Sequence, residues 1–142
     1  MPIFRSRFAN PVYNRLASNQ TINSTTTLQD IISIDLPIGT WDVDLYWGLS
    51  GTANTGTRHG FRSTLTTNVI RGYRMRGSSF GLVQINAGFN LGLAETSTDA
   101  WFKGVFEVTA AGSIFIQAAQ NTSHVDSLTV NTFTRAIARA LS

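Results

Sequence analysis

A strict alternation of apolar and polar residues in the segment TWDVDLYWGL, residues 40–49, restricts the fold more than any other feature of the sequence. Because successive side chains of a β-strand point to opposite faces, such alternation predicts a strand with one buried face. The opposite face, which includes Asp42, Asp44 and Tyr46, must meet solvent or a partner. The residues predicted to face the core are Trp41, Val43, Leu45, Trp47 and Leu49.

Segments on both sides repeat this period of two. Residues 28–37 (LQDIISIDLP) predict a strand that ends at Pro37. Residues 61–77 predict one or two strands, with Gly72 as a candidate bulge. Residues 78–93 follow, and their glycines mark bends or close approach of the backbone.

The C-terminal part of the chain has the same character. Residues 101–120 predict a β-hairpin whose turn is Ala110-Ala111-Gly112. Residues 127–138 predict a last strand, and the closing segment TRAIARALS fits a strand better than a helical turn. Seven or eight strands separated by turn signals, with no convincing helix, predict an all-β fold, an antiparallel β-sandwich, for a body of residues 28–142.

Residues 1–27 differ from this body, because they combine apolar residues and arginines with no carboxylate before Asp30. Two prolines and the Asn/Ser/Thr run of residues 18–27 argue against a helix or a core strand. We therefore predict an extended N-terminal arm that buries apolar side chains on a partner and pairs its arginines with carboxylates. The alternative is an arm that pairs with its own body as an edge strand. The residues expected to bind the partner are Ile3, Phe4, Arg5, Arg7, Phe8, Val12, Tyr13 and Arg15.

The composition bears on partners more than on chemistry. Charged residues make up 13% of the chain, about half the usual share, which fits either a surface covered by other subunits or a β-rich domain with Thr-rich outer faces. The net charge of +3 is spread unevenly, and a basic stretch without acids indicates steering toward an acidic partner. The absence of cysteine excludes disulfides and thiolate catalysis. The basic stretch would form a secondary basic surface that consists of Arg58, Arg62, Arg71, Arg74 and Arg76.

The order of the segments TTLQDIISIDLPIGTWDVDLYW, TGTRHGFR and FEVTAAGSIFIQAAQN resembles the jelly-roll modules, similar to the tumour-necrosis-factor fold, of bacteriophage virion proteins. The resemblance covers roughly residues 25–133 and implies a jelly-roll-like homotrimer on a virion. The sequence is similar in particular to head decoration (cement) proteins, in which one short body carries an arm that lies on the major capsid protein. It thus implies a structural protein that binds the outer capsid surface, bridges neighbouring capsid subunits and assembles in the host cytoplasm.

The runner-up is a receptor-binding tip, or fibre or spike head, that engages a host-surface glycan. Such modules usually end a longer chain with a stalk, which this sequence lacks. A tip needs an exposed aromatic platform, and Trp101 is the candidate, since Trp41 and Trp47 are in phase with the core residues.

Signals for catalysis, metals or nucleic acid are weak. His59 and His124 are expected to be solvated loop residues. Asp42 and Asp44 are expected to form ion pairs or to be solvated rather than to form a calcium site. The segment RGYRMRG, residues 71–77, could bind single-stranded nucleic acid, but a strand with a basic outer face is the simpler interpretation. No apolar run approaches the roughly 18 residues of a membrane span, and no secretory signal is recognisable. We expect no enzyme activity, no cofactor or metal, no nucleic acid and no membrane partner.

Overall fold

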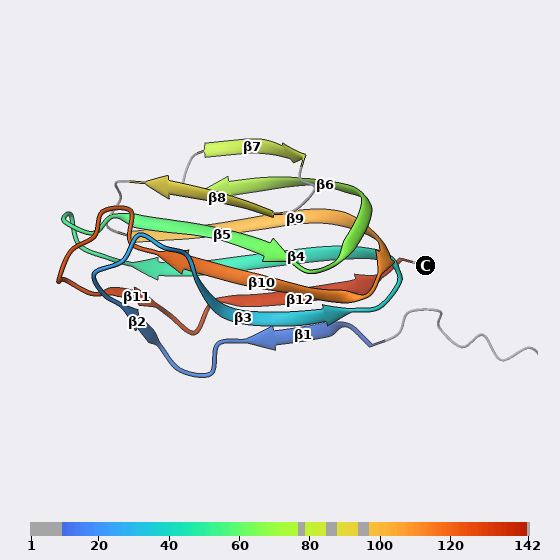
Figure 1. The fold of residues 1–142 in the computed structure, drawn as a ribbon, viewed down its shortest axis with the longest axis horizontal. Coiled ribbons are helices and arrows are strands. Elements are labelled where there is room, and N and C mark those ends of the chain that lie inside the picture. The colour runs from blue at the N-terminus through green and yellow to red at the C-terminus, as the bar shows by residue number, and fades with distance from the viewer. Residues whose placement is uncertain (1–9, 77–78, 85–87, 94–96, 142) are drawn as a thin grey trace, which may run out of the picture.

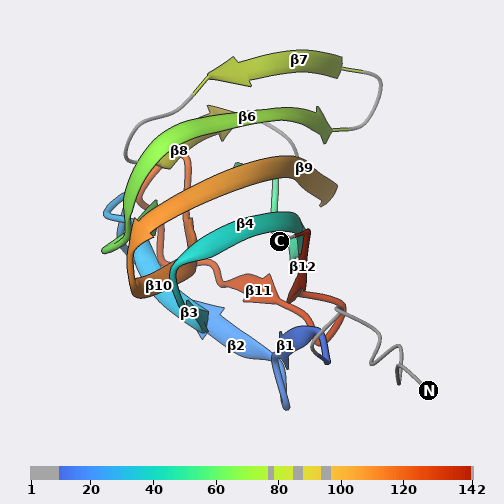
Figure 2. The ribbon, with the colours of Figure 1, turned by 90° about the vertical axis from the view of Figure 1, so that its right-hand side faces the viewer.

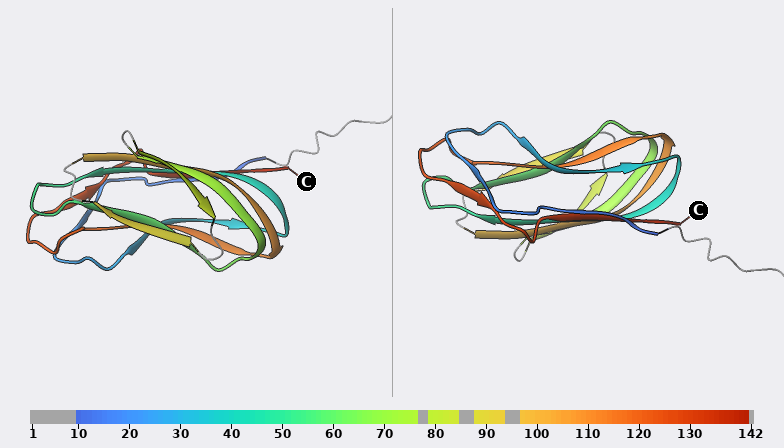
Figure 3. Two further views of the ribbon diagram at one scale, coloured as in Figure 1. Left: turned by 90° about the horizontal axis from the view of Figure 1, so that it is seen from above. Right: turned by 90° about the horizontal axis from the view of Figure 1, so that it is seen from below.

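The computed structural model describes residues 10–76, 79–84, 88–93 and 97–141 of the 142-residue chain. These residues form two antiparallel sheets packed face to face, and they contain no helix (Figures 1 and 3). The predicted all-β antiparallel sandwich is thereby confirmed. The larger sheet consists of β1 (Val12–Arg15), β2 (Gln20–Ile22), β4 (Gly39–Ser50), β6 (Thr66–Arg76), β7 (Ser79–Gln84), β9 (Ser97–Ala110), β11 (Leu128–Val130) and β12 (Arg135–Ala140). The smaller sheet consists of β3 (Gln29–Leu36), β5 (Thr57–Ser63), β8 (Gly88–Leu93) and β10 (Gly112–Ala119).

The connectivity is that of a jelly roll. The chain crosses repeatedly between the sheets, and the orders β1-β12-β4-β9 and β3-β10-β5-β8 face each other. The hairpin of β6 and β7 extends the larger sheet beyond β9, as Figure 2 shows. This arrangement leaves β1 and β7 as the ends of the main strand order of the larger sheet.

The core lies between the sheets and contains the residues that alternation placed there. All five predicted apolar residues of β4 are at most 5% exposed. Three rings from β5 and β9, those of Phe61, Phe102 and Phe106, meet at centroid distances of 5.2–6.1 Å. A Cβ at Gly72 would lie 2.4 Å from Cζ of Phe102, so this glycine gives the ring room. The predicted bulge at Gly72 is wrong, because the register shifts of β6 lie earlier, between Thr66 and Val69.

The predicted hairpin of residues 101–120 is also wrong. β9 pairs with β4 and β6, whereas β10 pairs with β3 and β5. The turn after Ala110 therefore carries the chain from one sheet to the other. The physical reason is that the inward residues of both strands, such as Val108 and Ile114, are fully apolar and buried. Two alternating strands that face each other across a core have the same local pattern as two strands that pair side by side.

The last predicted strand, residues 127–138, is interrupted. β11 ends at Val130, and a turn at residues 131–134 precedes β12. The strand assignment of TRAIARALS is confirmed by β12. The turn was not predicted because Thr134, although polar, is buried in phase with Leu128 and Val130, so the alternation of inward and outward residues runs through it. The hydroxyl of Thr134 accepts a hydrogen bond from the backbone N–H of Gly48 at 3.1 Å.

The predicted arm boundary at residue 27 does not match the strand pairing. β1 pairs with β12 and β2 pairs with β11, so both belong to the larger sheet. Leu16 and Ile22 are 5% and 6% exposed and are part of the core. Asn14 also donates from Nδ2 to the carbonyl oxygen of Ser33 at 2.8 Å, which links β1 to the smaller sheet. Periodicity did not predict β1 and β2, because these strands are short and each contributes few inward residues.

Candidate functional site

The outer face of the larger sheet carries the exposed aromatic residues of the sandwich. Strand register places Arg135, Tyr46 and Trp101 side by side across β12, β4 and β9. One row further along, Lys103 of β9 is the register partner of Tyr73, which is 49% exposed. This is the face of β4 that points away from the core, for which the alternation predicted contact with solvent or a partner. It therefore offers aromatic groups at the surface rather than a purely polar coat.

The charges at the centre of this face are paired with one another. Lys103 Nζ lies 3.3 Å from a carboxylate oxygen of Asp44 and 3.8 Å from one of Asp42. Arg139 donates to the other oxygen of Asp44 at 3.0 Å. The ion-pair prediction for the two aspartates is thus confirmed, with partners on both neighbouring strands. Pairing neutralises the centre of the face and leaves it suited to contact with another macromolecule.

At one end of this face lies a depression of about 370 Å³. Trp101, the candidate platform of the sequence, forms part of its wall beside Tyr46. Arg135 covers the Tyr46 ring, with its guanidinium carbon 4.4 Å from the ring centroid. Phe133, at the turn before β12, is 71% exposed at the rim. The complete lining is Tyr46, Trp47, Asp99, Ala100, Trp101, Asn131, Phe133 and Arg135.

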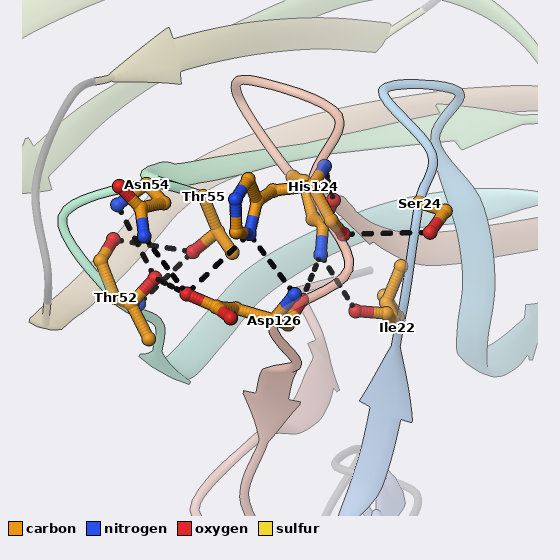
Figure 4. Close-up of polar contacts among 8 residues, drawn as sticks. Ile22, Ser24, Thr52, Asn54, Thr55, His124 and Asp126 are labelled. Carbon is orange, nitrogen blue, oxygen red and sulfur yellow. Dashed lines mark hydrogen bonds and ion pairs between the residues drawn. The ribbon is translucent and has the colours of Figure 1, made fainter.

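A second polar cluster joins the loops at one end of the sandwich (Figure 4). The carboxylate of Asp126 accepts hydrogen bonds from the hydroxyl of Thr52 at 2.9 Å and from Nδ2 of Asn54 at 3.1 Å. These bonds, foremost that from Asn54, lower the pKa of Asp126 below its usual value. The backbone N–H of Asp126 donates to Nδ1 of His124 at 3.1 Å, so His124 is held in the cluster rather than freely solvated.

Gln120 completes this cluster from inside. Its side chain is fully buried and donates from Nε2 to the carbonyl oxygens of Ile22 and Asp126, while its Oε1 accepts from the N–H of His124. Ser24 reaches the carbonyl oxygen of His124 from the β2–β3 loop (Figure 4). The cluster therefore connects three loops, and its contacts account for these polar residues as structural ties.

The predicted basic surface is divided between the two sheets. Arg62 of β5 forms a double hydrogen bond with Asp30, at 3.0 and 2.5 Å, and lies 3.8 Å above the Phe115 ring. This partner lowers the pKa of Asp30. Arg58 donates to the carbonyl oxygen of Thr26. Arg71, Arg74 and Arg76 belong instead to β6 in the larger sheet, and the side chains of Arg71 and Arg76 lie outside the described residues.

The predicted partner-binding residues are described only in part. Ile3, Phe4, Arg5, Arg7 and Phe8 lie outside the described residues. Val12 is half-buried against the core. The outer residues of β1 remain accessible, with Tyr13 53% exposed and Arg15 exposed.

Sequence reasoning missed most of the depression. Asp99, Asn131, Phe133 and Arg135 were not singled out, because register alone brings β9, β12 and the turn together. One signal was present in the sequence, since the predicted strand of residues 127–138 placed Phe133 opposite the core residues Leu128 and Val130. An exposed aromatic residue becomes informative when it adjoins others, as Phe133 does beside Tyr46 and Trp101.

No protein-family model matches the chain, and no curated protein matches it. Among the described residues, no group of three or more histidine and acidic side chains could hold a metal ion. In that same part of the chain, no helix has the length and apolarity needed to cross a bilayer. The fold and its surface chemistry therefore carry the functional interpretation.

Proposed function

We propose that this protein is a structural virion protein of a bacteriophage, a trimeric decoration protein that binds the outer capsid surface and bridges neighbouring major capsid protein subunits. The resemblance over residues 25–133 supports this role, and the jelly-roll connectivity is one that viral capsid proteins use. The observation that carries the proposal is the outer face of the larger sheet. There, the exposed Tyr13, Tyr73 and Val105 flank charges that are already paired with one another, and aromatic residues of this kind are enriched at protein interfaces.

The N-terminal residues extend this surface in the proposed mode of binding. Residues 1–9 precede β1, the strand at the end of the larger sheet's main order. Phe4 and Phe8 would bury their rings on the capsid, and Arg5 and Arg7 would pair with its carboxylates. Each fully buried large side chain contributes about 1.5–3 kcal/mol, and three linked copies would multiply the effect through effective concentration.

Co-sedimentation with purified capsids that lack the protein tests this role. The double variant Phe4→Ala/Phe8→Ala should lose most of its binding, and Tyr13→Ala should weaken it further. Val125→Ala is the matched control, because Val125 is 79% exposed but lies in a loop away from β1 and should not matter. Full decoration of capsids by the double variant would contradict the proposed role of the N-terminal residues. Failure of the intact protein to bind capsids would contradict the decoration role itself.

The second candidate is a receptor-binding tip that engages a host-surface glycan. The depression beside Trp101 is the observation that favours it, since a tip requires exposed aromatic residues on the body. Binding of the purified protein to host cells, with no binding to capsids, would select this function over decoration.

A further inference from the structure

The depression on the larger sheet depends on a glycine, Gly48, which has no side chain to fill it. Gly48 of β4 is the register partner of Asp99 on β9, one row beyond the pair Tyr46 and Trp101. A Cβ at Gly48 would lie 2.1 Å from Oδ1 of Asn131. The glycine thus allows the Asn131 side chain to lie against β4, beside the carboxylate and the two aromatic rings. The polar side chains of Asn131 and Asp99 and the rings of Tyr46 and Trp101 therefore line the same depression.

The turn that carries Phe133 is fixed by a dense set of hydrogen bonds. The N–H of Asn131 donates to the carbonyl oxygen of Gly48, and the N–H of Thr134 donates to the carbonyl oxygen of Asn131, both at 3.0 Å. Oδ1 of Asn131 accepts from the N–H of Phe133 at 3.0 Å. The carbonyl oxygen of Thr134 accepts from the N–H of Leu16, also at 3.0 Å. Phe133 is therefore held in an exposed position by its backbone, so a ligand would meet an aromatic group that needs little further ordering.

The polar groups of the hollow have donor and acceptor capacity left for a ligand. Among the described residues, no cation forms an ion pair with Asp99, and no carboxylate pairs with Arg135, whose guanidinium lies on the Tyr46 ring. Asp99 can accept hydrogen bonds and Arg135 can donate them, while the amide of Asn131 can do both. The formal charges of the carboxylate and the guanidinium cancel within the site.

We propose that this hollow binds a sugar residue of a neutral, pyranose-containing glycan. A pyranose has a C–H face that packs on aromatic rings and a rim of hydroxyl groups that both donate and accept, which matches Trp101 and Phe133 together with Asp99, Asn131 and Arg135. A purely apolar ligand would leave the three polar groups desolvated without partners. An anionic ligand would meet the carboxylate of Asp99. The volume of about 370 Å³ lies at the low end of the range for small-molecule sites, roughly 300–1,000 Å³, which suits one sugar residue of a longer chain.

Tryptophan fluorescence gives a direct test with the intact protein. Trp41 and Trp47 are 5% and 2% exposed, and their Nε1 atoms donate to the carbonyl oxygens of Pro37 and Gln117. Trp101 is the half-buried tryptophan, so a ligand in the hollow should change its emission most. We would titrate the methyl glycosides of the common neutral hexoses and N-acetylhexosamines, and record saturation-transfer NMR in parallel. At least one glycoside should bind saturably, with transfer to its ring C–H protons.

Variants then assign the binding to this hollow. Phe133→Ala should weaken the affinity about fivefold to tenfold, because one stacking ring is lost while the turn keeps its backbone bonds. Trp101→Ala should abolish the transfer signal. Tyr13→Ala is the matched control, since Tyr13 is an exposed aromatic of the same sheet that does not line the hollow, and it should bind as the parent does. Thermal melts of all variants establish that each is folded.

The proposal is overturned if no glycoside binds at millimolar concentration, or if binding survives both Phe133→Ala and Trp101→Ala. Saturable binding of adenosine monophosphate or inorganic phosphate at this hollow in place of the glycosides would also overturn it. The glycan site and the decoration role are tested on different residues, because glycoside binding is measured with Phe133 and Trp101 whereas capsid co-sedimentation is measured with Phe4, Phe8 and Tyr13. The two proposals therefore fail on different measurements.

Discussion

Single glycines shape both the core and the surface of this sandwich. At Gly72 an added methyl group would meet the ring of Phe102, which is fully buried, and the backbone oxygen of Lys103 at 2.7 Å. At Gly48 the three nearest atoms would all belong to the Asn131 side chain. The first obstacle cannot move without disturbing packed rings or the β9 backbone, whereas the second is the end of a polar side chain, which can turn away at the cost of its hydrogen bond from the N–H of Phe133.

We therefore predict that Gly72→Ala destabilises the fold by about 1–3 kcal/mol, as overpacking of a core does, and that Gly48→Ala costs less. Gly48→Ala should nevertheless fill the hollow and displace Asn131. Urea denaturation of both variants measures the free energy of unfolding. An equal or larger loss in Gly48→Ala would show that the Asn131 side chain is held more firmly than its position indicates.

A second residue-scale prediction concerns acid. The hydrogen bonds from Arg62, with help from Gln117, lower the pKa of Asp30 below its ordinary value of 3.8. Because the folded state favours the carboxylate, this stabilisation is present above pH 3.8 and is lost as the pH falls through the lower, folded-state pKa. Asp30→Asn should thus melt below the parent at neutral pH, and the difference should shrink in acid. Melting temperatures across this range provide the measurement, with the exposed Glu107→Gln as control, and a difference that stays constant with pH would contradict the expectation.

At the scale of elements, alternation identified which side chains face inward but not which strands become neighbours. The pattern of β4 placed its core residues correctly. The same kind of pattern made β9 and β10 look like a hairpin, although they lie in different sheets. The depression could not be predicted, since it requires the register of β4 with β9 and β12, which depends on contacts far apart in sequence. The short strands β1 and β2 were missed because only Leu16 and Ile22 connect them firmly to the core.

Deletions distinguish the paired part of the N-terminal region from the part that precedes it. Removal of residues 1–18 takes away β1 and the buried Leu16, and it exposes the edge of β12. We predict a clear loss of stability, because Leu16→Ala alone should cost about 2 kcal/mol or more. Removal of residues 1–9 should leave stability nearly unchanged, since every β1 pair is retained. Chemical denaturation compares the two, and an unaltered midpoint for the longer deletion would show that β1 contributes little to the sandwich.

At the scale of the whole molecule, the sandwich leaves aromatic surface that one copy does not cover. Tyr13, Tyr73 and Phe133 all lie on or beside the outer face of the larger sheet. Exposed apolar patches of this kind mark association surfaces in proteins with few charged residues.

We predict a homotrimer in dilute buffer, because a chain with only 13% charged residues leaves apolar surface that contact between copies would remove from water. Light scattering at micromolar concentration measures the mass directly. Tyr73→Glu should leave the trimer intact, since Tyr73 belongs to the face proposed to meet the capsid, and Val125→Glu, a change in a distant loop, should also leave it intact. A monomeric mass for the unaltered protein would contradict the prediction.

The pairing of β1 with β12 has a consequence for biosynthesis. A ribosome makes residues 12–15 well before residues 135–140, yet these segments are neighbours in the larger sheet. The inward face of Leu16 and the edge of β4 therefore stay uncovered until the final strand has left the exit tunnel. Pairings between such distant segments form slowly, because a long loop must close before any contact offsets its entropy. The nascent chain thus passes through a stage in which its longest strands are complete while one edge of β4 is still unpaired, and rapid docking of β12 limits the time in which that edge can aggregate.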